Sequence, residues 1–274
     1  MKQTVKDLLC AHGITLAAPV PLSALTVTRP YLLARHGIER GTAFVFAVPY
    51  YTTACDDPAR NISCYAVSRD YHSFFATLFD DILPILRKKF PQNRFAGFSD
   101  HSPIAEGEAA VKAGLGILGC NRLLLTKEHS SFVFLGEIIT DAELACEAKK
   151  ISVCTACGAC KRACPISLDV TKCLSALTQK KGALTEEEQR ALLSHKIAWG
   201  CDICQEHCPV THAARAAGTL YSTIPFFQEH TTPHVTAATV LEMTDDQFAA
   251  RAYSWRGREV ILRNLKLLEG KEQT

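Results

Sequence analysis

The sequence has no feature that would direct the chain into or across a membrane. No apolar run approaches the roughly 18 residues that a membrane-spanning helix requires. Residues 1–22 contain no sustained apolar stretch of the kind found in signal peptides. The formal net charge is only +2, so no excess of one sign demands a nucleic-acid or acidic partner. We therefore expect a cytoplasmic protein with no membrane association.

Thirteen cysteines stand out against this background. In a chain without an export signal they indicate reduced thiols or metal ligands rather than a disulfide framework. Disulfides are also unnecessary, because 274 residues with 47% hydrophobic content can bury a sizeable core. Eight of the cysteines lie between residues 154 and 208, and the other five are Cys10, Cys55, Cys64, Cys120 and Cys146. This change in cysteine usage predicts a domain boundary near residue 150.

The apolar patterns predict an α+β fold in three parts: an N-terminal α/β domain with a mixed sheet (1–150), a two-cluster ferredoxin-like domain (151–215) and a helical tail (216–274). Pro103 should open one of the N-terminal helices, since proline is favoured in a first turn. Capping boxes at Thr185/Glu188 and Thr244/Gln247 should start two later helices. The predicted strands are 43–48, 94–98, 122–126 and 132–140, and the predicted helices are 69–90, 103–113, 168–178, 185–198, 244–253 and 256–268.

The cysteine spacing predicts two [4Fe–4S] clusters. Bacterial two-cluster ferredoxins use the run C-x2-C-x2-C-x3-C-P, whose fourth cysteine binds the other cluster, and residues 154–165 match it. The second run, 201–209, is one cysteine short, and Cys173 completes the count. Pseudo-symmetry assigns Cys154, Cys157, Cys160 and Cys208 to one cluster, and Cys164, Cys173, Cys201 and Cys204 to the other.

Zinc is the alternative ligand for such cysteines. Two C-x2-C knuckles can form a zinc ribbon, but their usual separation is about 15–20 residues. Cys157 and Cys201 are much further apart than that. A ribbon would also leave four of the eight cysteines without a role, so the spacing favours iron–sulfur clusters.

The ordered motifs of the chain resemble those of the epoxyqueuosine reductases, cobalamin-dependent iron–sulfur enzymes of tRNA modification. The resemblance covers most of residues 43–268. Its motifs are Ile62-Ser63-Cys64-Tyr65, Arg69-Asp70-Tyr71-His72, Asp100-x2-Pro103-x2-Glu106, Gly114-Leu115-Gly116, Gly119-Cys120-Asn121, Phe134-Leu135-Gly136-Glu137-Ile138, the cysteine runs, Arg258-Glu259 and Leu262-Arg263-Asn264.

The resemblance implies a base-off cobalamin between the first two domains, with contacts from Cys64, Asn121, Leu124 and Leu135. It implies electrons from a ferredoxin- or flavodoxin-type donor and a tRNA substrate. The basic residues of the 177–182 segment suit phosphate contact, which makes Gln179 and Lys181 candidates for the substrate site; an ordinary solvated loop is the alternative. The basic tail is a candidate phosphate-facing patch, with a solvated helix face as the alternative, and its members are Arg251, Arg256, Arg258, Arg263, Lys266 and Lys271.

The resemblance also identifies Asp100 as the proton donor. Removal of an epoxide oxygen as water is general-acid work, and a carboxyl in a dry site would have a raised pKa. Considered locally, Asp100 would rather cap the following helix. His72 is expected to pack or to hydrogen-bond nearby rather than bind a metal.

Two departures from the family leave the substrate open. Cys120 stands where family members usually have a lysine, and the chain resembles a short form without the C-terminal HEAT-like repeats. The alternatives are a corrinoid iron–sulfur reductase of a small molecule and an iron–sulfur electron-transfer protein.

Overall fold

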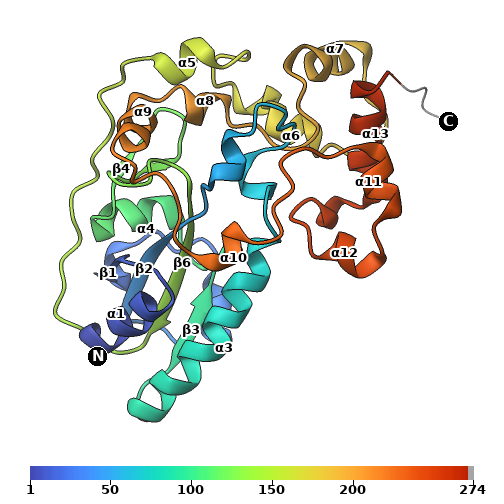
Figure 1. Ribbon diagram of the computed structural model, residues 1–274. Coiled ribbons are helices and arrows are strands. Elements are labelled where there is room, and N and C mark those ends of the chain that lie inside the picture. The colour runs from blue at the N-terminus through green and yellow to red at the C-terminus, as the bar shows by residue number, and fades with distance from the viewer. Residues whose placement is uncertain (271–274) are drawn as a thin grey trace.

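A four-stranded sheet organises the N-terminal half of the computed structural model, which describes residues 1–270 (Figure 1). Its strands are, in spatial order, β1 (Leu16–Pro21), β2 (Thr42–Pro49), β6 (Val133–Thr140) and β3 (Phe95–Phe98). All three pairings in this sheet are antiparallel. The predicted mixed sheet is therefore wrong, although the α+β composition is as expected.

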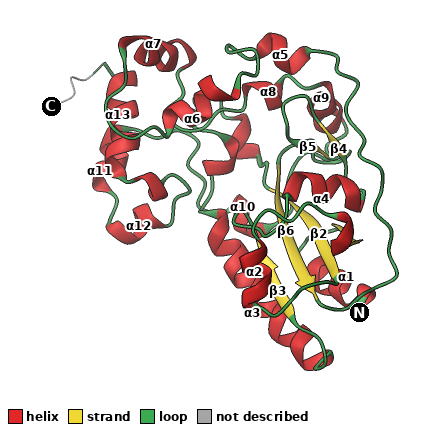
Figure 2. Cartoon of the chain, turned by 180° about the vertical axis from the view of Figure 1, so that it is seen from behind, coloured by secondary structure: helices red, strands yellow, loops and turns green. Residues whose placement is uncertain are grey.

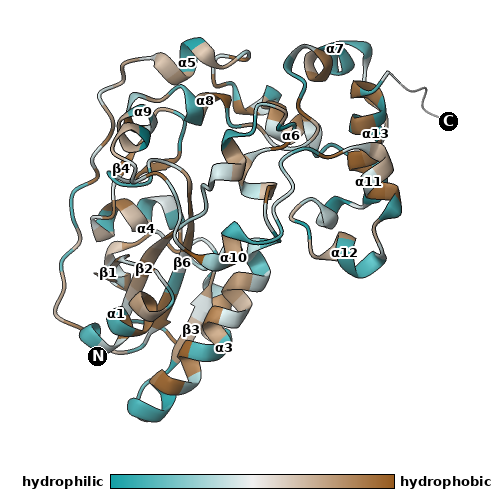
Figure 3. Cartoon of the chain, in the orientation of Figure 1, coloured by the Kyte–Doolittle hydropathy of each residue, from teal (hydrophilic) through white to brown (hydrophobic). Residues whose placement is uncertain are grey.

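The burial of strand β2 explains why its apolar sequence pattern did not distinguish an antiparallel sheet from one with parallel strands. All eight of its residues are buried. Phe44 and Phe46 enter one hydrophobic core, whereas Ala43 and Val45 enter a second core on the opposite face. Helices cover both faces, so an antiparallel strand here has the continuous apolar run that is typical of parallel sheets. Figure 3 shows the sheet as the apolar centre of this half.

Helices α1 (Lys2–Ala11) and α3 (Tyr71–Lys89) contribute to the first core, and α2 (Pro30–Arg35) and α4 (Glu106–Ala113) contribute to the second. Helix α4 begins three residues after Pro103, so that proline does not open it. A short two-stranded sheet, β4 (Ile117–Leu118) with β5 (Leu124–Leu125), follows α4.

The C-terminal half consists of short helices joined by loops (Figure 2). They are α5 (Ala159–Ala163), α6 (Leu174–Thr178), α7 (Glu186–His195), α8 (Ile203–Glu206), α9 (Pro209–Ala216), α10 (Pro225–Gln228), α11 (Ala237–Glu242), α12 (Asp245–Ala249) and α13 (Arg258–Leu268). Single 3-10 turns occur at Leu22–Ala24, Thr53–Asp56, Cys64–Ala66, Val170–Lys172 and Ser254–Arg256.

The two predicted capping boxes are present, at Thr185 with Glu188 and at Thr244 with Gln247. The predicted helix 168–178 is instead a 3-10 turn followed by α6. The break falls at Cys173, whose backbone is extended (ψ 128°) and which caps α6.

The two halves share one core. Trp199 and Leu265 belong to the same buried cluster as Phe44 and Phe46. Phe227 of α10 packs on Phe74 of α3, with ring centroids 5.2 Å apart. The change in cysteine usage near residue 150 therefore does not separate two cores.

Much of the predicted basic tail is structural. Arg251 is 5% exposed and donates to the backbone carbonyls of Ala66, Val67 and His230. Arg258 donates to three carbonyls at the end of α11 and start of α12, and Arg263 donates to the 180–182 loop. These three guanidinium groups hold the fold together, so for Arg251, Arg258 and Arg263 the prediction of a phosphate-facing patch is wrong; Lys271 lies outside the described residues.

Across residues 1–270, no helix combines the length and the apolar character needed to cross a membrane.

Candidate functional site

The eight clustered cysteines gather by fours around two small cavities. Cys154, Cys157, Cys160 and Cys208 line a cavity of about 60 Å³. Cys164, Cys173, Cys201 and Cys204 line a second of about 90 Å³. These are the two sets that the spacing predicts. Cys164 belongs to the first run but lines the second cavity, and Cys208 belongs to the second run but lines the first. Cys120 lines both cavities, and apart from it each cavity has four cysteines of its own, the number of thiolates that a cubane cluster requires.

Local backbone geometry explains how the first run surrounds its cavity. Ala156 (φ 53°) and Gly158 (φ 79°) are left-handed, and Gly158 caps α5, which carries Cys160. Alternation of this kind turns successive N–H groups inward and forms the concave anion site typical of iron–sulfur centres. Pro209 starts α9 directly after Cys208, which is extended and 9% exposed.

Cys120 and Asn121 lie between the two cavities and line both. The Sγ atoms of Cys120 and Cys154 are 3.5 Å apart. The side-chain nitrogen of Asn121 is 4.0 Å from the Sγ of Cys204. The structure thus directs Asn121 toward the thiol of Cys204, where an amide can hydrogen-bond to the sulfur.

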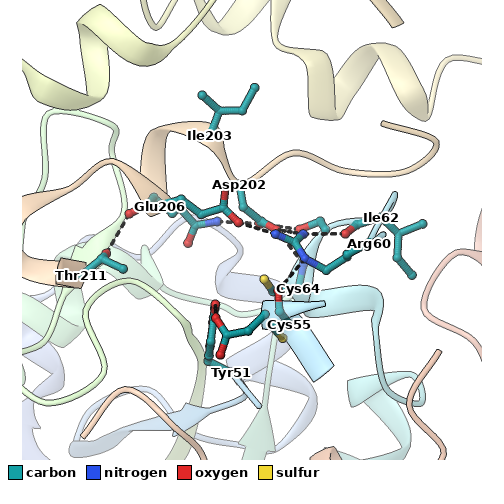
Figure 4. Close-up of polar contacts among 12 residues, drawn as sticks. Tyr51, Cys55, Arg60, Ile62, Cys64, Asp202, Ile203, Glu206 and Thr211 are labelled. Carbon is teal, nitrogen blue, oxygen red and sulfur yellow. Dashed lines mark hydrogen bonds and ion pairs between the residues drawn. The ribbon is translucent and has the colours of Figure 1, made fainter. Parts of the chain in front are cut away.

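A buried polar network ties the second cysteine run to the N-terminal half (Figure 4). The carboxylate of Asp202 accepts hydrogen bonds from Ser63 Oγ (2.5 Å), the Cys64 N–H (2.7 Å) and Arg60 (3.0 Å). Arg60 also pairs with Glu206. Because Asp202 follows Cys201 directly, these contacts position the loop that carries Cys201 and Cys204.

Cys64, Asp202 and Glu206 could in principle hold a metal ion, since their ligand atoms lie within 4.8 Å of one another. The guanidinium of Arg60 already forms ion pairs with both carboxylates. Burial and the neighbouring Cys55 raise the pKa of Cys64 well above its ordinary value, so its thiol is neutral. The arrangement favours a structural ion pair over a metal centre.

The predicted cobalamin contacts fit that cofactor only in part. The side chains of Cys64 and Leu124 are 2% and 5% exposed, so neither faces an open surface. Leu135 is partly exposed, and its carbonyl accepts a hydrogen bond from Ser99 Oγ (3.0 Å). Cys64 and Leu124 are therefore covered in this structure, whereas Leu135 and Asn121 are partly exposed.

Asp100 projects from a turn after β3, in the left-handed region (φ 63°), with its side chain 66% exposed. Its carboxylate lies 3.6 Å from His72 Nε2. The other ring nitrogen of His72 lies 2.8 Å from Asp70, which caps α3. The N-cap of α4 is Ala105, so Asp100 does not cap that helix and the local alternative is wrong.

Charge pairing governs the protonation of His72 and Asp100. The contact with the Asp100 carboxylate, followed by the hydrogen bond to Asp70, raises the pKa of His72 to about 9. The same contact with His72 outweighs burial and lowers the pKa of Asp100. The prediction that a dry site raises the pKa of Asp100 is therefore wrong; the proton at neutral pH is on His72.

Gln179 and Lys181 line a cavity of about 700 Å³ beside Cys173. The side chain of Gln179 donates to the Ser175 carbonyl (3.0 Å), whereas Lys181 is exposed. Lys172 and Arg256 also line the cavity. The Arg256 guanidinium stacks at 3.8 Å over the ring of Trp255, which is 58% exposed. The lining thus carries lysine and arginine side chains together with Glu187 and Glu188, and Trp255 lies next to it through its contact with Arg256.

The sequence analysis did not identify three functional features: the link between His72 and Asp100, the Arg60–Asp202 anchor and a buried carboxyl at Glu137. Arg60 is far in sequence from Asp202, as His72 is from Asp100, so only the fold reveals these contacts. The Asp70-Tyr71-His72 motif was a usable signal for His72.

No protein-family model matches the chain. Curated proteins named epoxyqueuosine reductase are similar: that of Gloeobacter violaceus is 31% identical over 72% of this chain and 65% of its own length, and that of Escherichia coli is 32% identical over 74% and 53%. That of Aliivibrio fischeri is 36% identical over 65% of this chain and 54% of its own length. The chain thus spans about half to two thirds of the length of these relatives.

Solved structures share the fold. An epoxyqueuosine reductase from Streptococcus thermophilus matches 98% of this chain and 80% of its own with a TM-score of 0.79 at 22% identity. One with an epoxyqueuosine-modified tRNA-Tyr stem loop matches 97% and 80% with a TM-score of 0.75 at 20% identity. A Bacillus subtilis structure, whose catalytic aspartate loop is swung out of the active site, matches 97% and 81% with a TM-score of 0.73 at 21% identity. The chain belongs to the epoxyqueuosine reductase family.

Proposed function

We propose that this protein is a cytoplasmic oxidoreductase that reduces epoxyqueuosine in tRNA to queuosine, using two [4Fe–4S] clusters and base-off cobalamin. The observation that carries the proposal is the gathering of eight cysteines by fours into two neighbouring cavities. Membership of the family supports the substrate, and one relative of the same fold has been solved with an epoxyqueuosine-modified stem loop.

The clusters would supply single electrons, and cobalamin, when bound, would supply the reducing metal centre that meets the substrate. Cys154, Cys157, Cys160 and Cys208 would hold the outer cluster, because Cys157 is exposed at the surface. A ferredoxin- or flavodoxin-type donor would dock there. Cys164, Cys173, Cys201 and Cys204 would hold the inner cluster, with the amide of Asn121 beside Cys204.

Asp100 would deliver protons to the departing oxygen. Reduction of an epoxide to an alkene consumes two electrons and two protons and releases one water. Asp100 itself is largely ionised at neutral pH, but the adjacent imidazolium of His72 holds a proton within reach. Asp70 keeps the ring of His72 oriented. Each proton that Asp100 delivers could therefore be replaced through His72.

The cavity beside Cys173 would receive the RNA. Lys172, Lys181 and Arg256 supply positive charge for phosphates, and the exposed ring of Trp255 supplies a surface on which an unstacked base can lie. Single-stranded loops are recognised by this combination of charge and aromatic stacking.

The test is incubation of the chemically reduced, cofactor-loaded protein with epoxyqueuosine-containing tRNA and, separately, with the free nucleoside. Conversion of the tRNA substrate alone, or far faster than the nucleoside, is the expected result. Conversion of the free nucleoside only would favour the small-molecule reductase. No conversion of either, with both clusters reduced, would favour electron transfer as the function.

A further inference from the structure

Glu137 on β6 is a buried carboxyl that the proposed reaction does not use. It is 0% exposed, and neither of its carboxyl oxygens has a hydrogen-bond partner within residues 1–270. An unpaired carboxylate in such a place would cost several kcal/mol, so the group is neutral instead. Burial, followed by the charge of Glu106, raises its pKa well above the ordinary range.

Glu106, the first residue of α4, is the acidic neighbour of Glu137 on the side of Asp100. Its Oε1 atom accepts the backbone N–H of Asp100 at 3.0 Å. Burial is the main cause that raises its pKa to about 7, while the Asp100 N–H and the charge of Arg29 lower it. Val45, the residue opposite Glu137 on β2, cannot titrate.

The turn that carries Asp100 is fixed on both sides. Before it, Ser99 Oγ donates to the Leu135 carbonyl (3.0 Å). After it, the N–H groups of Thr28 and Arg29 bond to the Pro103 carbonyl at 2.8 and 3.1 Å. Between these points the left-handed backbone of Asp100 is strained for a residue with a side chain. Within the turn, the His101 N–H donates to the Ser99 carbonyl (2.7 Å) and Arg29 donates to the Ser102 carbonyl (2.9 Å), while the Asp100 N–H itself is held by Glu106.

We propose that Glu106 is a positioning residue for Asp100: its carboxylate holds the Asp100 N–H and fixes the turn, while Glu137 keeps a proton and leaves the negative charge of the pair on Glu106. The role of Asp100 rests on the proposed function, whereas the hold on its amide does not. A neutral Glu137 makes this possible, because a charged Glu137 would repel the nearby carboxylate of Glu106.

Hydrogen exchange at the Asp100 amide tests the hold directly. An N–H bonded to a charged acceptor should lose protection when that acceptor is removed, so Glu106→Ala should exchange there about 10- to 100-fold faster. Glu106→Gln keeps an acceptor of the same shape and should lose less protection. In the unaltered protein, protection of the Asp100 amide should fall as pH drops below about 7, once the exchange rate has been corrected for its intrinsic pH dependence. In Glu106→Gln this pH dependence of protection should vanish.

Glu108→Ala, on the same turn of α4 but paired with Lys112, is the matched control and should change neither exchange nor turnover. Glu137→Gln, which mimics the protonated acid, should leave the protection of Asp100 unchanged. Unchanged protection in both Glu106 variants, or lost protection in Glu137→Gln, would overturn the inference. If exchange behaves as expected but no tRNA is reduced by the unaltered protein, the positioning stands and the proposed function fails.

Discussion

Replacing Arg60 by Ala should destabilise the protein and loosen the second cysteine cavity. The Arg60 side chain is 15% exposed and that of its partner Asp202 is 1% exposed. Its guanidinium also donates to the carbonyls of Cys55 (2.8 Å) and Ile62 (2.7 Å). Loss of one partner from a buried ion pair costs about 3–5 kcal/mol. Asp202 keeps donors from Ser63, Cys64 and Gln205, so we expect the lower end, about 3 kcal/mol.

In a chain of this length that loss corresponds to a melting temperature lower by roughly 6–12 °C. The assay is anaerobic thermal unfolding followed by circular dichroism, with the visible absorbance of the clusters recorded in parallel. Arg40→Ala is the matched control, because its pair with Glu143 is exposed and should shift the midpoint little. A shift for Arg60→Ala no larger than that of Arg40→Ala would refute the anchoring role of the network.

Three further predictions follow from the same contacts. Because the folded-state pKa of His72 is raised to about 9, the stability that its charge adds is complete below pH about 6.5 and disappears as pH rises through 9. The thermal midpoints of His72→Gln and the unaltered protein should therefore converge at high pH. A gap between the two midpoints that stays constant with pH would contradict this. Cys173→Ser should lower anaerobically reconstituted iron from about eight per chain toward four, whereas Cys120→Ser should retain about eight; equal iron in the two variants would remove Cys173 from the ligand set. Lys181→Ala should weaken tRNA binding and reduce its salt dependence by about one counterion, whereas Arg251→Met should lower the melting temperature without changing that slope.

Apart from Cys173, which was assigned because it completes the count, the cysteine sets were predictable from local spacing. Cys164 and Cys208 each follow a run of cysteines and precede a proline; Pro209 starts α9, as the motif predicts, whereas Pro165 begins a turn and the helix expected there is absent from the described residues. That the two residues then line opposite cavities is what the motif implies. The same local logic gave the capping boxes at Thr185 and Thr244, since all their partners lie within one helical turn.

The first part of the sheet was not predictable in the same way. Strand β1 contains Pro19 and Pro21, and proline in a sequence argues against a strand. The two prolines are tolerated because β1 is at the edge of the sheet. Helix α1 has only Val5 and Leu9 as buried residues, too few for a clear apolar period. Strand direction was also hidden, because β2 is apolar on both faces.

The chemistry around Asp100 depended on contacts that the sequence does not reveal. His72 and Asp100 belong to separate motifs, and only the packing of α3 beside β3 brings them together. That contact reverses the direction in which the pKa of Asp100 moves. Burial alone predicts a raised value, but the nearby cation decides the outcome.

The most direct test of the account is single-turnover reduction of epoxyqueuosine tRNA by the unaltered protein and by Asp100→Asn, with iron and cobalamin contents matched. The loss of one oxygen from the nucleoside, measured by mass spectrometry, reports the reaction itself. We predict complete conversion by the unaltered protein and a rate about 100- to 10,000-fold lower for Asp100→Asn, the usual cost of a lost general acid. Equal rates would reject Asp100 as the proton donor, and no oxygen loss with the fully loaded, unaltered protein would contradict the proposed function.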